Sequence, residues 1–252
     1  MKRKQIAVQL YTLRDFLKTP KEIAKTLKKV KKIGFEAVEV GGLGPIDTAE
    51  LKEILDGEGL ACCATHESGS MIFDEPGKVA EKLDILGCKY VSYPWPHTSP
   101  KTKEDYKQLA DMLNKSGKTL AKSGKTLAYH NHAIEFERFG KKNGLEIIYS
   151  ETDPKYLQGE LDTFWIQHGG GNPVEWCERL DGRLPLLHLK EFGIIDNQIT
   201  MLEIGSGNLN WKKIVKAARK SGTRWFIIEQ DTCRICPFDS LEISLKYLME
   251  KV

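Results

Sequence analysis

The sequence lacks an apolar run of the roughly 18 to 20 residues that a helix needs to cross a bilayer. It opens with Met1-Lys2-Arg3-Lys4, which leads directly into an expected strand and not into the apolar core of a signal peptide. We therefore expect a cytoplasmic protein that contacts no membrane.

A large excess of charge of one sign is also missing. Lys and Arg number 38 and Asp and Glu 35, so the formal net charge is +3, well short of the basic excess of a dedicated nucleic-acid binder. With 40% hydrophobic and 29% charged residues, the composition is that of a globular protein with a sizeable core. Nucleic acid is therefore not expected as a partner.

The cysteines form no pattern typical of an extracellular disulfide framework. Cys62 and Cys63 adjoin on one expected strand, so their side chains point to opposite faces. Cys233 and Cys236 form a CxxC, but no second Cys/His pair accompanies it, so the signal for zinc or redox chemistry is weak. We expect all six cysteines to be reduced thiols.

A glycine-rich phosphate loop is missing too, since neither GxGxxG nor a Walker motif follows the first expected strand. What recurs instead is a unit of amphipathic helix, glycine and apolar strand. Glycine is favoured after a helix because the residue there usually adopts a left-handed conformation. The glycines of this unit are Gly34, Gly59, Gly87, Gly124 and Gly222.

Further strands fit residues 5–11, 157–162 and 184–190, which brings the total to about eight. Strict alternation of strands and helices with short connections implies parallel strands and crossover helices. The strand number and the length of 252 residues are typical of one barrel. We therefore predict an α/β fold in which residues 1–252 form a single-domain (β/α)8 TIM barrel.

The hexapeptide Ser-Gly-Lys-Thr-Leu-Ala occurs twice, at residues 116–121 and 123–128. We expect the first copy in a helix and the second at the start of a strand, because each copy falls in a different part of the repeating unit.

Polar side chains gather at the carboxyl ends of the expected strands, where barrel enzymes have their active sites. Every histidine lies at such an end or in the loop beyond it: His66, His97, His130, His132, His168 and His188. Carboxylates follow the same distribution: Glu39, Glu160, Asp162, Glu229 and Asp231.

Burying so many carboxylates and imidazoles would cost several kcal/mol for each unpaired ion. A bound cation offsets that cost, and mixed nitrogen and oxygen donors suit Mn²⁺, Zn²⁺, Co²⁺ or Fe²⁺. We predict one divalent metal whose identity stays open, with Mg²⁺ as a further choice. The alternative is a buried network of salt bridges.

Several short motifs along the chain together form one set that points to a family. They are Leu127-Ala128-Tyr129-His130-Asn131-His132 with Glu135-Phe136, Glu160-Leu161-Asp162-Thr163-Phe164-Trp165, His188-Leu189-Lys190, Gly205-Ser206-Gly207 and Ile228-Glu229-Gln230-Asp231. The set resembles the sugar phosphate isomerase/epimerase superfamily, the xylose isomerase-like barrels. The resemblance runs from Gln9 to the last helix and indicates no particular substrate.

The resemblance implies one divalent metal held at the ends of the fifth to eighth strands. Its ligands would be His130, Asp162, His188 and Glu229. Many members have Glu where His130 stands, and Glu135 is the alternative fourth ligand.

The resemblance also implies a metal-dependent sugar isomerase or epimerase that acts through an enediolate. Members typically use the carboxylates of the fifth and eighth strands as acid and base. Because His130 replaces one of these, His132 is a natural base beside Glu229, since imidazole titrates near neutral pH. Lys190 would neutralise oxyanion charge or serve as an ion-pair partner. The expected substrate contacts are His66, Glu160, Trp95 and Trp165.

Other functions stay open at this point. A dehydratase or lyase of the inosose dehydratase type would use the same enolate and expel a hydroxyl. An endonuclease IV-like nuclease would need about three metals and a basic groove, and a barrel could also bind sugar without turnover.

The partner is expected to be a small-molecule carbohydrate: a sugar, a keto-sugar or a sugar phosphate. Gly205-Ser206-Gly207 could present backbone amides to a phosphate. The loop from Thr232 to Phe238 is a candidate lid or oligomer contact, so a homo-oligomer stays open.

Overall fold

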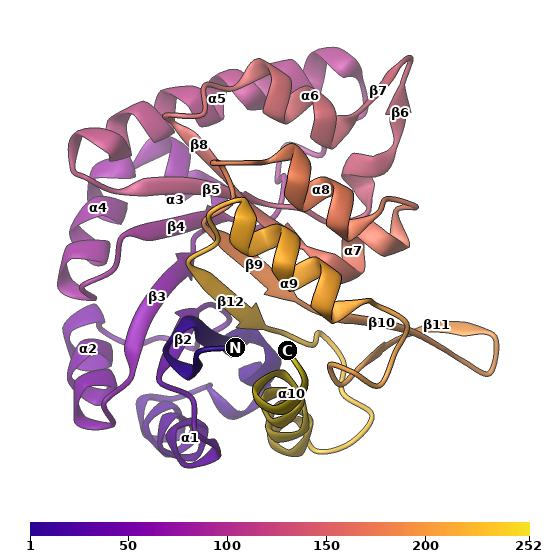
Figure 1. The fold of residues 1–252 in the computed structure, drawn as a ribbon. Coiled ribbons are helices and arrows are strands. Elements are labelled where there is room, and N and C mark those ends of the chain that lie inside the picture. Colours follow the sequence, from indigo (N-terminus) through magenta and orange to yellow (C-terminus); the bar gives the residue numbers. More distant parts are fainter.

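The computed structural model describes residues 1–252 and confirms the predicted barrel (Figure 1). Eight parallel strands close in the order β1-β12-β9-β8-β5-β4-β3-β2. Their bounds are β1 Ile6–Gln9, β2 Ala37–Val40, β3 Ala61–His66, β4 Tyr90–Tyr93, β5 Thr126–His130, β8 Leu157–Asp162, β9 Leu186–Leu189 and β12 Trp225–Ile228. The first and last strands pair with Ile6 opposite Phe226 and Val8 opposite Ile228, which closes the barrel.

Helices surround the barrel on the outside (Figure 1). They are α1 Pro20–Ile33, α2 Thr48–Gly57, α3 Gly69–Asp74, α4 Pro76–Ile85, α5 Lys103–Lys122, α6 Gly144–Glu151, α7 Thr163–His168, α8 Pro173–Arg179, α9 Trp211–Lys220 and α10 Pro237–Lys251. Short 3-10 helices lie at η1 Arg3–Gln5, η2 Leu10–Phe16 and η3 Ile134–Phe136. No helix is long and apolar enough to span a membrane.

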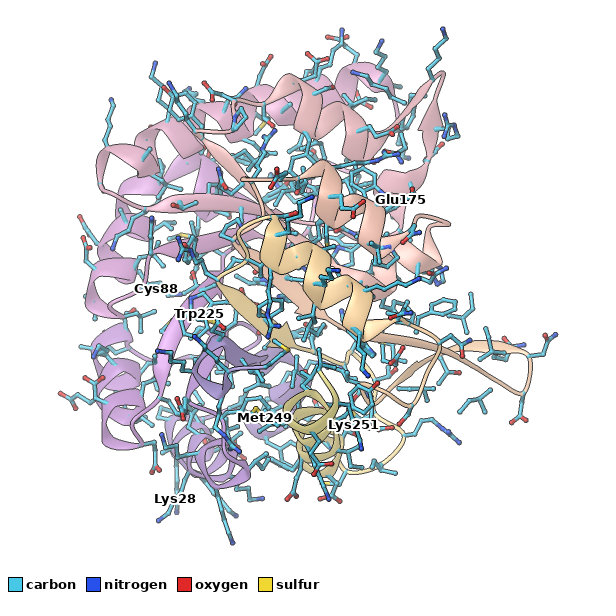
Figure 2. All side chains as sticks on the ribbon, in the orientation of Figure 1. Lys28, Cys88, Glu175, Trp225, Met249 and Lys251 are labelled. Carbon is cyan, nitrogen blue, oxygen red and sulfur yellow. The ribbon has the colours of Figure 1, made fainter.

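Helix α1 shows how local sequence sets these boundaries. The Thr19 side chain accepts the backbone N–H of Glu22 at its start, and Gly34 ends it with φ of +114°, a conformation that other residues rarely adopt. Leu27 is buried against the barrel, whereas Lys28 extends into solvent (Figure 2).

The duplicated hexapeptide adopts both expected structures. Its first copy lies within α5, where a β-carbon on Gly117 would meet the Tyr156 carbonyl oxygen at 2.0 Å. Its second copy leads into β5, and there Gly124 has φ of +69° in the turn. The glycine at the second position of the hexapeptide therefore permits a close backbone approach in the first copy and a left-handed turn in the second.

Two hairpins lie outside the barrel. They are β6 Arg138–Phe139 with β7 Lys142–Asn143, and β10 Glu191–Ile195 with β11 Gln198–Leu202. The β10-β11 hairpin extends away from the barrel wall (Figure 1).

The interior of the barrel has a separate apolar layer of mostly small side chains. It consists of Ala7, Ala37, Cys63, Ala64, Ala128, Leu186 and Ile227. Small side chains suffice because the strands converge on a narrow lumen. The polar residues at the strand ends lie beyond this layer, so the candidate site has an apolar floor.

Candidate metal and substrate site

The carboxyl ends of seven barrel strands supply one cluster of polar side chains, as the sequence predicts. Its members are Gln9, Glu39, His66, His130, Glu160, Asp162, His188 and Glu229. All are buried except His66, whose side chain is 13% exposed and faces the cavity above.

Four of these residues form a candidate metal site. The ligand atoms of His130, Asp162, His188 and Glu229 all lie within 4.8 Å of one another. His188 Nδ1 is 2.9 Å from Glu229 Oε2 and 4.0 Å from Asp162 Oδ2. Asp162 Oδ1 accepts the Trp165 N–H, and its buried Oδ2 is paired with the Lys190 ammonium at 3.0 Å. The buried His130 Nδ1 has no hydrogen-bond partner, and this mixed set of nitrogen and oxygen donors fits a divalent cation.

A second group of possible ligands overlaps the first. His66, His130, Glu160 and His188 also place their ligand atoms within 4.8 Å. His66 Nε2 lies 2.7 Å from Glu160 Oε2, so the two residues expected to bind substrate contact each other directly. Both groups contain His130 and His188, so the distances between ligand atoms allow a cation in either group.

Glu39 and Gln9 belong to the same cluster; the sequence analysis placed Glu39 among the strand-end carboxylates without a specific role and did not single out Gln9. Glu39 Oε2 is 2.6 Å from His188 Nε2 and accepts a hydrogen bond from Gln9 Nε2 at 2.8 Å. Both residues lie at or next to a strand end, which was the available signal. The contact between Glu39 and His188 joins residues 149 positions apart in the chain.

Glu135 lies outside both groups of possible ligands. Its Oε1 accepts the Tyr129 hydroxyl at 2.9 Å and its Oε2 accepts the His132 N–H at 2.8 Å. Burial raises the pKa of Glu135 to about 7. The carboxylate thus supports the end of β5, whereas His130 belongs to both groups.

Lys190 is the cation of the cluster. Its Nζ lies 2.8 Å from Glu229 Oε2, 3.0 Å from Asp162 Oδ2 and 3.1 Å from Asp231 Oδ1. Burial by itself would lower the pKa of Lys190, but the three carboxylates raise it overall. The ammonium therefore stays charged and compensates part of the negative charge.

The cluster opens into a cavity of about 560 Å³. His132 lines it, and its buried Nδ1 has no hydrogen-bond partner. Burial and the nearby Lys190 ammonium lower the pKa of His132 to about 3, so its imidazole is neutral at pH 7. The rings of Trp95 and Trp165 lie 4.7 and 5.3 Å from the His132 ring, and Trp95 is 48% exposed at the mouth.

The other two histidines take no part in lining this cavity. His97 Nδ1 is hydrogen-bonded to the Tyr93 hydroxyl at 2.8 Å, and His168 is exposed at the end of α7. Two of the six histidines therefore lie outside the cluster, one in the loop after β4 and one at the end of α7.

The Gly205-Ser206-Gly207 turn is not open to an external anion. The N–H groups of Gly205 and Leu209 donate to the buried Glu191 carboxylate at 2.9 and 3.1 Å, and the Trp211 indole N–H donates to it as well. A side chain of the protein itself thus occupies the place that a phosphate would take. This corrects the reading of the turn as a candidate phosphate site.

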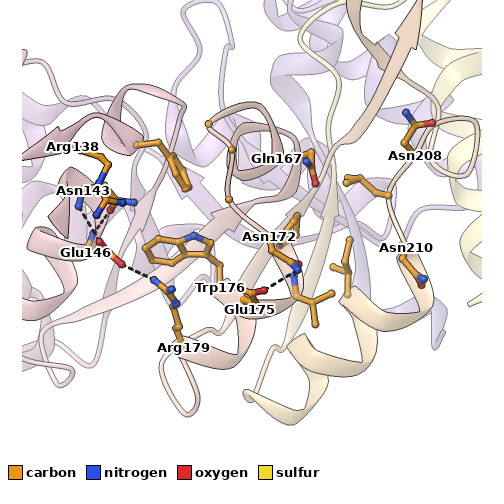
Figure 3. A pocket seen from close by; sticks show the side chains of 18 residues that line it. Arg138, Asn143, Glu146, Gln167, Asn172, Glu175, Trp176, Arg179, Asn208 and Asn210 are labelled. Atoms are coloured by element: carbon orange, nitrogen blue, oxygen red, sulfur yellow. Dashed lines mark hydrogen bonds and ion pairs between the residues drawn. The ribbon is translucent and has the colours of Figure 1, made fainter. Parts of the chain in front are cut away.

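A larger cavity, of about 760 Å³, lies between α6, α8 and the loop before α9 (Figure 3). Its polar side chains pair with one another, with Arg179 2.7 Å from Glu146 and Asn172 3.1 Å from Glu175. None of the histidines or carboxylates of the strand-end cluster lines it. The smaller cavity, which is lined by His66, His130 and His132, is therefore the candidate active site.

A closed parallel barrel with this cluster at its strand ends defines a class of barrel enzymes, and sequence comparison specifies the family. Residues 27–248 match the family described as "Xylose isomerase-like TIM barrel", and the chain belongs to it.

Curated relatives of the chain are dehydratases. Inosose dehydratase of Clostridium beijerinckii is 25% identical over 260 residues, with 86% of each protein covered. Inosose dehydratase of Geobacillus thermodenitrificans is 25% identical over 256 residues, covering 86% of this chain and 85% of the relative.

Solved structures share the whole fold. A sugar phosphate isomerase/epimerase of Parabacteroides distasonis superposes with a TM-score of 0.83 at 26% identity, covering 100% of this chain and 95% of the other. The IOLI protein with a bound zinc atom has a TM-score of 0.74 at 15% identity, covering 98% and 97%, which shows the common fold alone.

Proposed function

We propose that the protein is a metal-dependent isomerase or epimerase of a keto-sugar or related polyhydroxylated ketone. The observation that carries this proposal is the cluster of His130, Asp162, His188 and Glu229, whose ligand atoms lie within 4.8 Å of one another at the base of a cavity. A divalent metal bound there would supply a Lewis acid that polarises a substrate oxygen. A protein of the same fold binds a zinc atom, which supports a metal in this chain as well.

Proton transfer is assigned to His132 and Glu229, both of which line the cavity. The neutral His132 ring has an unpartnered Nδ1 that can take a proton from the carbon next to a substrate carbonyl. Its pKa of about 3, and not the near-neutral pKa that the sequence led us to expect, makes it a weak base in the metal-free protein. Lys190, which also lines the cavity, would stabilise negative charge that develops on the substrate oxygen.

Substrate binding is assigned to the surrounding residues. His66, oriented by its 2.7 Å contact with Glu160, reaches the cavity and can bond a substrate hydroxyl. Trp95 lines the cavity and would pack against the apolar face of a sugar ring, and Trp165, whose ring also lies against His132, would extend that apolar surface.

The charge of the cavity favours a substrate without phosphate. Lys190 is its one lysine or arginine, and three carboxylates already surround that ammonium. In the glycine turn the Gly205 amide donates to Glu191 and the Ser206 amide donates to the Glu203 carbonyl oxygen. A phosphate would have no free cation to bind, so we assign a free sugar or cyclitol ketone.

Dehydration is a second candidate, because the curated relatives above are named inosose dehydratase. Removal of the same proton followed by loss of a neighbouring hydroxyl would give that reaction. Incubating candidate ketones in D₂O and following them by mass spectrometry separates the two: deuterium exchange without loss of water indicates isomerisation or epimerisation.

We also assign the protein to the cytoplasm. Its six cysteines are all free, and four are buried, as is typical of a reducing compartment.

The first experiment measures metal per chain in the purified wild type, in Asp162→Ala and in the exposed control Asp181→Ala. About one equivalent in the wild type and the control, with little in Asp162→Ala, supports the proposal. Near zero in all three after incubation with Mn²⁺, Co²⁺ and Zn²⁺ would refute it.

A further inference from the structure

We propose that Cys62 and Cys88 form a peroxide-sensitive thiol pair, which closes to a disulfide between β3 and β4 and reopens when it is reduced. Both cysteines are free thiols in the structure. They lie near the amino ends of these strands, whereas the candidate active site lies at the carboxyl ends. The inference therefore goes beyond the proposed function and does not depend on it.

The two sulfur atoms occupy equivalent positions on neighbouring strands. Cys62 Sγ lies 3.5 Å from the Ala64 carbonyl oxygen, and Cys88 Sγ lies 3.3 Å from the Tyr90 carbonyl oxygen. Ala64 and Tyr90 lie opposite each other where β3 pairs with β4, so each cysteine precedes one member of that pair by two residues. The Cys62 thiol donates a hydrogen bond to the Cys88 sulfur.

Both side chains point to the same face of the barrel wall. Cys62 and Cys88 belong to the large hydrophobic core between the barrel and its helices, whereas Cys63 belongs to the small layer inside the barrel. Neighbouring strands lie about 4.8 Å apart, and the α-carbons of a disulfide are about 4.4–6.8 Å apart. A bond between Cys62 and Cys88 therefore requires no large movement of the backbone.

The pair lies directly beneath the surface at the base of the barrel. Cys62 and Cys88 are 8% and 3% exposed, and their chain neighbours Ala61, Gly87 and Lys89 are exposed. An oxidant close to water in size needs only a small local opening to reach the sulfur atoms, whereas a bulky disulfide such as oxidised glutathione needs a large one. We therefore assign hydrogen peroxide as the oxidant.

Cys88 is the thiol that reacts first, because the thiolate is the reactive form. The hydrogen bond from Cys62 lowers the pKa of Cys88 despite burial, and a backbone hydrogen bond from Tyr90 and the Lys125 ammonium lower it further. Lys125 is fixed there, since its Nζ lies 3.0 Å from the Cys88 carbonyl oxygen and 2.6 Å from Asp84. The same hydrogen bond raises the pKa of Cys62, which stays protonated.

Oxidation of the pair proceeds in two balanced steps. The Cys88 thiolate attacks one peroxide oxygen, so that an S–O bond forms, the O–O bond breaks and hydroxide leaves, which gives a sulfenic acid. The Cys62 sulfur then attacks the Cys88 sulfur, so that the S–S bond forms, the S–O bond breaks and the hydroxyl leaves with the Cys62 proton as water. The first hydroxide takes up the Cys88 proton. Two thiols are oxidised to one disulfide, and the peroxide is reduced to two waters.

Peptide mapping of the full chain tests the proposal. The reduced protein is treated with hydrogen peroxide, the remaining thiols are alkylated in denaturant, and tryptic peptides are analysed by mass spectrometry without reduction. Trypsin places Cys62 and Cys63 together in peptide 53–78 and Cys88 in peptide 83–89. We expect these peptides to be linked, two hydrogens lighter than their sum, and to separate after dithiothreitol.

Matched variants and fragment ions identify the partner of Cys88. Cys63→Ala should keep the linked peptides, whereas Cys62→Ala should lose them and leave Cys88 as a sulfenic acid that dimedone labels. Thermal unfolding verifies that each variant is folded. In the wild type, fragment ions that separate Cys62 from Cys63 should place the link on Cys62, which tests the assignment without any variant.

The exposed Cys236 serves as the internal control, and the peroxide concentration is raised until this thiol is oxidised. Absence of linked peptides in the wild type at that concentration would overturn the proposal. A link that the fragment ions place on Cys63, or linked peptides that persist in folded Cys62→Ala, would overturn it as well. None of these results changes the expected metal content, so the proposed function stands or fails separately.

Discussion

The Lys190 ammonium nitrogen lies 2.8 Å from Glu229 Oε2, and the Lys190 side chain is buried with 1% of its surface exposed. The same nitrogen contacts Asp162 and Asp231. One side chain thus holds together carboxylates that come from β8 and from the end of β12. This arrangement preforms the metal site, because both proposed carboxylate ligands are fixed by one buried cation.

Replacing Lys190 by Met should therefore destabilise the metal-free protein by about 3–5 kcal/mol, since buried carboxylates lose their partner. Added Zn²⁺ should restore part of the loss, because a cation then compensates the same charges. Urea unfolding with chelator and with Zn²⁺ measures both effects. Lys18→Met is the control, because the Lys18–Asp15 pair is exposed and should contribute less than about 1 kcal/mol. Equal losses in the two variants would contradict the prediction.

Glu191→Gln should cost about 2–4 kcal/mol of folding free energy, measured by chemical denaturation. The carboxylate accepts N–H groups on both oxygens, from Phe192 and Leu209 on one and from Gly205 and Trp211 on the other. An amide has one acceptor oxygen, so its NH₂ group would face donors.

The control for that variant is Glu203→Gln in the same loop region. Glu203 accepts one hydrogen bond, from Ser240, and an amide oxygen can still accept it. A change below about 0.5 kcal/mol is expected there. A loss equally small in Glu191→Gln would show that the turn does not depend on this carboxylate.

Glu135 should make stability fall as pH rises between about 4.5 and 7. Burial raises its pKa from 4.5 to about 7 in the folded protein, so the folded state binds more protons than the unfolded state in that window. The stabilisation is complete below pH 4.5 and is lost by pH 7, a change on the order of 3 kcal/mol.

Glu135→Gln should remove this component of the pH dependence. Its amide can donate to the Tyr129 hydroxyl and accept the His132 N–H, as a protonated carboxyl does. Urea unfolding at pH 4.5 to 7.5 compares the two proteins. The same slope in both would assign the dependence to other groups.

Trp95→Ala should raise KM about two- to tenfold with a smaller change in kcat, because the ring would bind the substrate and not the reacting atoms. Steady-state kinetics on the ketone identified by the exchange assay measures this. Ile85→Ala is a control of similar exposure, 46% against 48%, on a helix away from the cavity. A pure fall in kcat would instead place Trp95 in the chemical step.

The barrel and the general location of the site follow from local sequence. Gly34, Gly59, Gly87, Gly124 and Gly222 all have positive φ, so each marks a helix-to-strand turn as predicted. The strands that follow two of these glycines carry His130 and Glu229, and the strands expected at residues 157–162 and 184–190 carry Asp162 and His188. The structure brings the ligand atoms of these four residues together. These predictions succeed because turn conformation and strand periodicity depend on residues close together in the chain.

Other features were decided by tertiary contacts alone. The glycine turn has the local pattern of an anion site, yet its Gly205 amide donates to Glu191. Glu135 lies near the fifth-strand ligand in sequence, but it accepts a hydrogen bond from Tyr129. The two copies of one hexapeptide adopt a helix and the start of a strand. The contact of Glu39 with His188 joins residues 149 positions apart. Sequence thus determined which groups reach the strand ends, whereas the partner of each group depended on packing between distant segments, because a hydrogen bond requires an atomic separation that local spacing does not fix.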